Sequence, residues 1–117
     1  MLSMPFDPTE PTLRDILRHI DYAERFIAGF HWPTFRNDHK TVFAVTRCLE
    51  IISEASRRLP AEIKLRHPPI DWRSMAGAGN VYRHDYDDIE TQFIWHTVNL
   101  ALPPPRAVIE AELESGR

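Results

Sequence analysis

The residues best suited to acid–base chemistry are concentrated in one stretch, DWRSMAGAGNVYRHDY, at positions 71–86. Within it, Asn80 is followed by Arg83 three residues later and by His84 four residues later, so on a helix the three side chains share one face. An imidazole can transfer protons near neutral pH. A guanidinium can hold phosphate oxygens in a planar fork, and an amide can position either group. This face therefore suits metal-independent cleavage of an RNA phosphodiester.

One such face is half a site, because cleavage needs one group to remove a proton and another to supply one. A two-fold dimer that sets two of these helices across a groove would supply the second group. The preceding Ala76-Gly77-Ala78-Gly79 run carries almost no side chain, although each helical glycine costs about 1 kcal/mol relative to alanine. That cost indicates close approach by another helix or a ligand. The other interpretation stays open: Arg83 and His84 are two polar residues at an exposed helix end.

The same stretch carries a resemblance to a known family. The run from Met75 to Tyr86, MAGAGNVYRHDY, resembles the signature of the HepT-like ribonuclease toxins of the HEPN superfamily, which is Arg-Asn, three residues, His, one residue, Tyr. Asn80, His84 and Tyr86 fall on the motif's Asn, His and Tyr, while Gly79 stands where the motif has arginine. A second block, LEIISEA at residues 49–55, is also similar to the family.

The resemblance implies an all-α, HEPN-like homodimer that acts as the toxin of a type VII toxin–antitoxin pair. Its activity would be metal-independent endoribonuclease cleavage, with His84 and Asn80 as catalytic residues and Arg83 in place of the missing arginine. It further implies that a nucleotidyltransferase antitoxin silences the toxin by attaching AMP to Tyr86. The alternative is a non-catalytic helical dimer that binds the nucleotidyltransferase but lost cleavage with the arginine at Gly79.

Composition excludes several other function classes. The histidines include no pair at the three- or four-residue spacing of metal ligands, and a single cysteine cannot build a zinc site, so neither a metal nor a cofactor is expected. No apolar run approaches the roughly 18 residues that a membrane span needs, and no secretory signal is visible. We therefore expect a cytoplasmic protein without a membrane partner.

Charge is unevenly distributed along the chain. The net charge of −3 argues against indiscriminate nucleic-acid binding, and no DNA partner is expected. Residues 57–83, however, hold six basic and two acidic residues, whereas residues 85–117 hold seven acidic and two basic ones. The first segment could attract the phosphates of an RNA substrate and the second could face a basic partner, or the asymmetry is chance variation.

Apolar periodicity predicts a single domain over residues 1–117, an up-down bundle of four main helices and a short C-terminal helix. Residues 1–11 are predicted to be an extended arm, with Thr12 and Asp15 capping the first helix and Gly29 ending it. The Trp32-Pro33 region is predicted as a turn. The later helices are expected from the Asp38 cap to about Leu59, from the Asp71 cap through the motif, over residues 89–102, and, after a stop at Pro103–Pro105, to Leu113.

The second helix carries charged residues opposite its apolar stripe. Their spacing fits a solvated face with weak ion pairs, or a face in which Glu54 or Arg47 lines the groove together with Arg73 and Gly79. Cys48, beside the apolar stripe, is predicted to be a buried small hydrophobe. The helix over residues 89–102 is apolar over a wide arc, which predicts burial by the core on one side and by a second subunit on the other.

Overall fold

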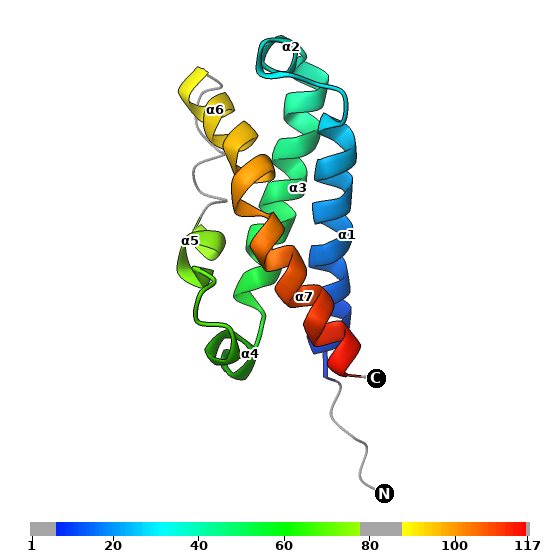
Figure 1. Ribbon diagram of the computed structural model, residues 1–117, viewed down its shortest axis with the longest axis vertical. Coiled ribbons are helices and arrows are strands. Elements are labelled where there is room, and N and C mark those ends of the chain that lie inside the picture. The colour runs from blue at the N-terminus through cyan, green and yellow to red at the C-terminus, as the bar shows by residue number, and fades with distance from the viewer. Residues whose placement is uncertain (1–6, 78–87, 117) are drawn as a thin grey trace, which may run out of the picture.

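The computed structural model describes residues 7–77 and 88–116, and all regular structure in these two ranges is helical, which confirms the all-α class. Within the same ranges no helix combines the length and apolarity needed to cross a membrane. In chain order the elements are α1 (Thr9–Ile27), α2 (Trp32–Asn37), α3 (His39–Arg57), α4 (Ala61–Arg66), α5 (Trp72–Gly77), α6 (Asp88–His96), the π-helical turn η2 (Thr97–Ala101) and α7 (Pro103–Ser115) (Figure 1).

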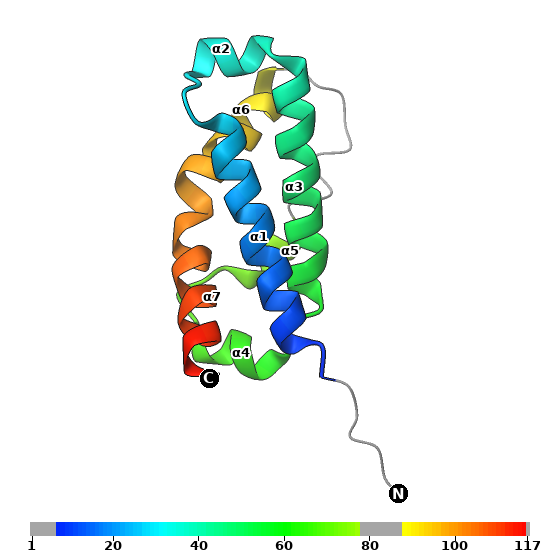
Figure 2. The same cartoon turned by 90° about the vertical axis from the view of Figure 1, so that its right-hand side faces the viewer.

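The two 19-residue helices α1 and α3 pack side by side in opposite directions and form the scaffold (Figures 1 and 2). Both carry apolar residues at three- and four-residue spacing, which places them on one face of each helix. Apolar residues of the two helices with less than 5% exposure include Leu13, Ile16, Ile20 and Ala23 in α1 and Val42, Val45, Leu49 and Ile52 in α3.

Two local signals fix the ends of the scaffold helices where the sequence predicts them. Gly29 has a φ of +83°, a left-handed conformation that glycine adopts without strain, and it follows the end of α1 closely. The Asp38 carboxylate accepts a hydrogen bond from the Thr41 amide at 3.1 Å and so caps the start of α3.

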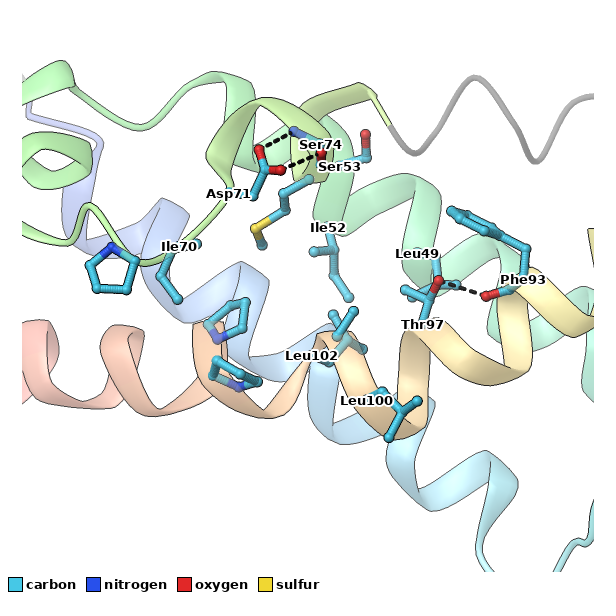
Figure 3. Close-up of a pocket in the computed structure, with 15 residues that line it drawn as sticks. Leu49, Ile52, Ser53, Ile70, Asp71, Ser74, Phe93, Thr97, Leu100 and Leu102 are labelled. Atoms are coloured by element: carbon cyan, nitrogen blue, oxygen red, sulfur yellow. Dashed lines mark hydrogen bonds between the residues drawn. The ribbon is translucent and has the colours of Figure 1, made fainter.

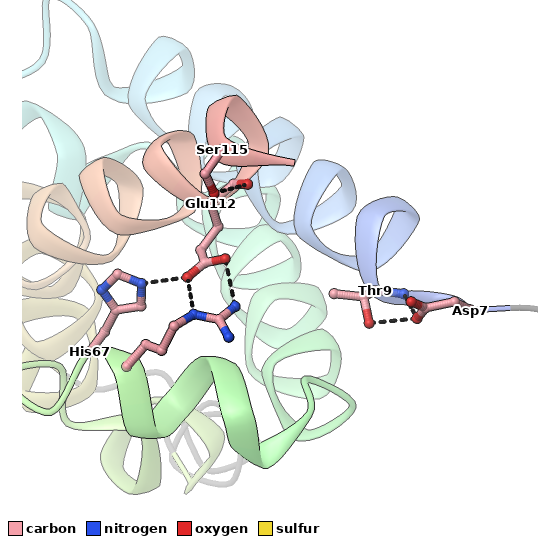
Figure 4. Close-up of polar contacts among 6 residues, drawn as sticks. Asp7, Thr9, His67, Glu112 and Ser115 are labelled. Atoms are coloured by element: carbon pink, nitrogen blue, oxygen red, sulfur yellow. Dashed lines mark hydrogen bonds and ion pairs between the residues drawn. The ribbon is translucent and has the colours of Figure 1, made fainter. Parts of the chain in front are cut away.

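The start of α1 differs from the prediction. Asp7 Oδ1 accepts hydrogen bonds from the Thr9 amide at 3.0 Å and from its hydroxyl at 2.7 Å, and the helix begins at Thr9 (Figure 4). Thr12 is buried inside the first turn, where its amide donates to the Pro8 carbonyl at 2.9 Å. Thr12 therefore does not cap the helix, and the predicted arm is helical from Thr9 onward; residues 1–6 lie outside the described part of the chain.

Prolines begin helices at two places where the sequence reading expected a turn or a stop. The predicted turn at Trp32-Pro33 is the first turn of α2, and Pro103–Pro105 form the first turn of the 13-residue α7. Proline is tolerated there because the first helical residues have amides without intrahelical partners. The last helix is consequently longer than predicted, and it buries Ile109 completely.

The helical run over the predicted range 89–102 is interrupted by the π turn η2, in which the Leu102 amide donates to the Thr97 carbonyl at 3.0 Å. One side of this run is buried in the core through Ile94 and Val98, at 1% and 2% exposure. The opposite side leaves Ile89 at 76% and Leu100 at 71% exposure. Burial of one side by the core is thus confirmed. Burial of the opposite side by a second subunit stays a prediction.

Candidate functional site

The side chains predicted to carry the chemistry lie between the two described ranges, which end at Gly77 and resume at Asp88. The predicted residues outside the described part are Gly79, Asn80, Arg83, His84 and Tyr86. The structure does describe α5, the helix that leads into this stretch, and the surfaces of α3 and η2 beside it. The candidate site is therefore described below through these elements.

The beginning of α5 is fixed by a side-chain cap and one buried ring. The Asp71 carboxylate accepts hydrogen bonds from the Ser74 amide at 3.0 Å and hydroxyl at 2.7 Å, which confirms the predicted cap. These two donors stabilise the charged form and lower the pKa of Asp71 below its ordinary value. Trp72 is 8% exposed, and its indole donates to the His67 carbonyl at 3.1 Å.

The end of α5 is held by two side chains from α3. The Ala76 carbonyl accepts a hydrogen bond from Ser53 Oγ at 2.7 Å and another from Arg57 Nη2 at 2.7 Å. Sequence reasoning placed Arg57 on the charged face of the second helix and in the phosphate-attracting segment, and gave Ser53 no role. Their four-residue spacing, which sets both on one face of α3, was the available signal.

An apolar groove of about 340 Å³ lies between α5 and η2 with α3 as its floor (Figure 3). Ile52 lies centrally in the close-up, Ile70 lies at one end, and Phe93 lies at the other. Thr97 Oγ1 donates a hydrogen bond to the Phe93 carbonyl at 2.7 Å, so this hydroxyl group already has an acceptor within its own helix. The lining residues are Leu49, Ile52, Ser53, Pro69, Ile70, Asp71, Ser74, Met75, Phe93, Thr97, Leu100, Ala101, Leu102, Pro104 and Pro105.

The described candidates for groove lining are not part of this apolar groove. Arg47 is exposed, with Nη1 3.9 Å from a carboxylate oxygen of Glu50. Glu54 is exposed and lies 3.6 Å from Arg58, and Arg73 is exposed on α5. Their predicted position in a cleft shared by two copies of the chain stays a prediction.

One residue of the basic segment, Arg66, forms an ion pair with a helix at the C-terminal end of the chain. Arg66 donates to both carboxylate oxygens of Glu112 in α7, at 3.0 and 2.9 Å, and His67 Nε2 lies 2.7 Å from the same carboxylate (Figure 4). The Arg66 hydrogen bonds, with a smaller contribution from His67, lower the pKa of Glu112 to about 2. Arg66 thus ties α4 to α7. Arg57 bonds the Ala76 carbonyl and Arg58 pairs with Glu54, so Lys64 and Arg73 are the described cations of the predicted phosphate-attracting segment that remain for an RNA phosphate.

Cys48 is buried at 4% exposure in the core cluster, as predicted. Burial raises the pKa of its thiol, because the thiolate would lose hydration. The side chain therefore packs as a small hydrophobe. Among the described residues, no three or more His, Cys, Asp or Glu side chains are grouped so that they could hold a metal ion.

Comparison with known proteins gives one consistent result. The profile of the family described as "Ribonuclease HepT-like" matches residues 16–112. A probable ribonuclease HepT from Thermococcus cleftensis is 38% identical over 98 residues, covering 84% of this chain and 89% of the relative. Two proteins from Methanocaldococcus jannaschii with provisional RNase names are each 30% identical over 100 residues, covering 86% of this chain and 83% and 86% of those proteins. No solved structure gave a significant match.

Proposed function

The chain belongs to the HepT-like ribonuclease family, and from this premise we propose that it is an endoribonuclease that cleaves RNA phosphodiesters without a metal. The observation that carries the proposal is the family match over residues 16–112, which spans both the motif stretch and the second block at residues 49–55. Within the motif stretch, Asn80, His84 and Tyr86 occupy the positions of the family's Asn, His and Tyr.

In the proposed reaction His84 transfers a proton at the ribose 2′-hydroxyl or at the leaving 5′-oxygen. Asn80 orients the imidazole or the phosphate by hydrogen bonding. A cation must stabilise the negative charge that builds on the phosphate oxygens, and with Gly79 at the motif's arginine position we assign this role to Arg83.

We further propose that the active form is a homodimer. The exposed side of α6 and η2 carries three large apolar residues, Ile89, Phe93 and Leu100, and the last two also line the apolar groove. Apolar surface gathered in this way is typical of an interface. A two-fold axis would let each copy cover the other's groove, because the same patch serves both partners.

The dimer proposal has a matched pair of variants. Leu100 and Leu65 are both exposed leucines, at 71% and 79%, but Leu65 lies on α4 and away from the groove. Leu100→Glu is expected to convert the dimer to a monomer in light scattering, while Leu65→Glu leaves the mass unchanged. A wild-type protein that stays monomeric at high concentration would end this part of the proposal.

The proposed regulation is that of a toxin–antitoxin pair. A partner nucleotidyltransferase would attach AMP to Tyr86, three residues from Arg83 and two from His84 in the sequence. The added phosphate would pair with the guanidinium and compete with RNA for it. Incubation with ATP and the product of a neighbouring nucleotidyltransferase gene should add the mass of AMP to the wild type but not to Tyr86→Phe.

The second candidate function is a non-catalytic helical dimer that binds the nucleotidyltransferase. Gly79 favours it, because the family motif has arginine at that position. If this candidate is correct, the wild type cleaves no RNA, and Gly79→Arg is the substitution that should create cleavage.

The deciding experiment is expression of the chain alone, followed by RNA cleavage in the presence of EDTA. Growth arrest and cleavage that His84→Ala abolishes support the enzyme. His96→Ala, at an exposed histidine of α6, is the matched control and should behave as wild type. An Arg83→Ala variant with undiminished cleavage would show that the cation comes from elsewhere.

A further inference from the structure

We propose that Ser53 and Arg57 are positioning residues for cleavage, because they fix the end of α5 from which the motif stretch departs. This inference rests on the proposed ribonuclease function. It assigns a role to two α3 residues that neither the motif nor the family resemblance assigns. Both side chains act through one acceptor, the carbonyl oxygen of Ala76.

The geometry of this contact is that of two short hydrogen bonds to a single carbonyl. Ser53 Oγ and Arg57 Nη2 each lie 2.7 Å from the Ala76 oxygen. A carbonyl has two lone pairs, so it can accept both donors. The guanidinium makes a charge-assisted bond, which is stronger than a neutral one. Ser53 as a residue is 2% exposed, so water competes little for its bond.

Helix α5 needs such an attachment because it is too short to be stable alone. It has six residues, and isolated helices of fewer than about 12 residues are marginal in water. Its orientation therefore depends on contacts with the rest of the chain, which are the buried Trp72 at its beginning and the α3 hydrogen bonds at its end.

The consequence for catalysis follows from sequence distance. Gly79, Asn80 and His84 come three, four and eight residues after Ala76 in the sequence, so an error in the direction of α5 displaces Gly77, the last described residue before them. A misplacement of about 1 Å can lower a catalytic rate roughly 100-fold. Three residues of the LEIISEA block contribute to this arrangement: Leu49 and Ile52 line the groove, and Ser53 holds the neighbouring helix.

The test compares Arg57→Ala with Arg58→Ala. These adjacent arginines are both exposed at the end of α3, but only Arg57 contacts Ala76, while Arg58 pairs with Glu54. Two further variants are Ser53→Ala, which removes the uncharged donor, and Arg57→Lys, whose ammonium group can donate to the same carbonyl. The substrate is an end-labelled, mixed-sequence single-stranded RNA, and the structural readout is the NMR shift of the Ala76 carbonyl carbon.

We expect Arg57→Ala and Ser53→Ala to lower kcat roughly 10- to 100-fold with KM changed by less than about twofold, and to shift the Ala76 carbonyl resonance. Arg57→Lys should recover most of the rate, and Arg58→Ala should leave kcat and the Ala76 carbonyl resonance at their wild-type values. If Ser53→Ala fails to fold, the exposed Arg57 and Arg58 variants decide the question.

Two results would overturn the inference. The first is an Arg57→Ala variant that raises KM alone, since this is the behaviour of a phosphate contact. The second is an Ala76 carbonyl resonance that does not move in either alanine variant. If the wild type cleaves no RNA at all, the proposed function fails, and the carbonyl shift still decides whether Ser53 and Arg57 hold α5.

Discussion

Helices α7 and α5 both attach to the α1–α3 scaffold, but by different means. Helix α7 has 13 residues, buries Ile109 completely and is tied to α1 by Arg106, which bonds Asp21. Helix α5 has six residues, one buried side chain and hydrogen bonds from α3 at its end. The difference teaches that the elements that stabilise the fold are largely separate from the element that leads into the motif stretch.

The open groove is the physical result of this asymmetry. Because α5 is short and η2 does not cover it, a groove remains between the two elements. Leu49 and Ile52 line this groove, and each is only 2% exposed. The closed side, between α1, α3 and α7, holds most of the fully buried apolar residues. The following predictions test whether stability and function are divided in this way.

The largest loss of stability is expected from a substitution in the closed side. Ile16 is 0% exposed in the α1–α3 interface, so Ile16→Ala should lower the free energy of unfolding by about 2–5 kcal/mol, through lost burial and a cavity. Met75, half-buried on α5, is the matched site on the open side, and Met75→Ala should cost clearly less. Urea unfolding at fixed protein concentration measures both. Equal losses of unfolding free energy in the two variants would show that the closed and open sides contribute equally to stability, which contradicts the comparison.

The next effect concerns the one buried side chain of α5. Trp72→Phe keeps an aromatic ring but removes the indole donor and leaves the His67 carbonyl without this partner. The expected loss is about 1–3 kcal/mol, the usual cost of a buried group that loses its hydrogen bond. Urea unfolding gives the value, and a loss below about 0.5 kcal/mol would mean that Trp72 does not hold α5.

A smaller, pH-dependent effect is expected at the α4–α7 end. The pKa of Glu112 is lowered from 4.5 to about 2 by Arg66 and His67, so its ionised form stabilises the folded state above about pH 4.5. This stabilisation is lost as the pH falls from 4.5 through 2. It is modest because the Arg66 side chain is 52% exposed and screened by water.

Glu112→Gln should therefore flatten the acid limb of a plot of unfolding free energy against pH and change little in its shape above pH 5. Glu114→Gln, at an exposed position of the same helix, is the control and should keep the wild-type curve. An unchanged acid limb in Glu112→Gln would contradict the assignment of this ion pair as a stabilising contact.

The smallest effect is expected on the exposed face of α3. Glu54 and Arg58 are 3.6 Å apart with side chains 66% and 51% exposed, so Glu54→Ala should change the unfolding free energy by less than about 0.5 kcal/mol. RNA cleavage by the same variant sharpens the comparison. Unchanged stability with reduced cleavage would support the predicted position of Glu54 in a cleft shared by two copies.

Much of the fold could be predicted because its signals are local. Gly29 after α1, Asp38 before α3 and Asp71 before α5 each act within a few residues, and each was located correctly. The proline-rich segments were misjudged, because a proline that cannot continue one helix is well suited to begin the next. The start of α1 was missed because the helix begins three residues before Thr12, at Thr9, whose amide is bound by the Asp7 carboxylate.

The candidate site was less predictable because its described contacts are tertiary. Periodicity set Ser53 and Arg57 on one face of α3 but could not show that the Ala76 carbonyl, 23 and 19 residues later, lies opposite them. The groove likewise depends on how α5 and η2 sit on α3. The motif side chains were chosen by residue type and by resemblance, and they remain predictions.

The run Pro103–Pro105 at the start of α7 has a consequence for the groove. Proline has no amide hydrogen, so the carbonyls of Asn99, Leu100 and Ala101 meet no N–H group four residues ahead. Leu100 and Ala101 line the groove. At this rim the carbonyls of apolar residues therefore lack the usual helical N–H partner, and a surface that covers the groove would gain from bringing hydrogen-bond donors of its own.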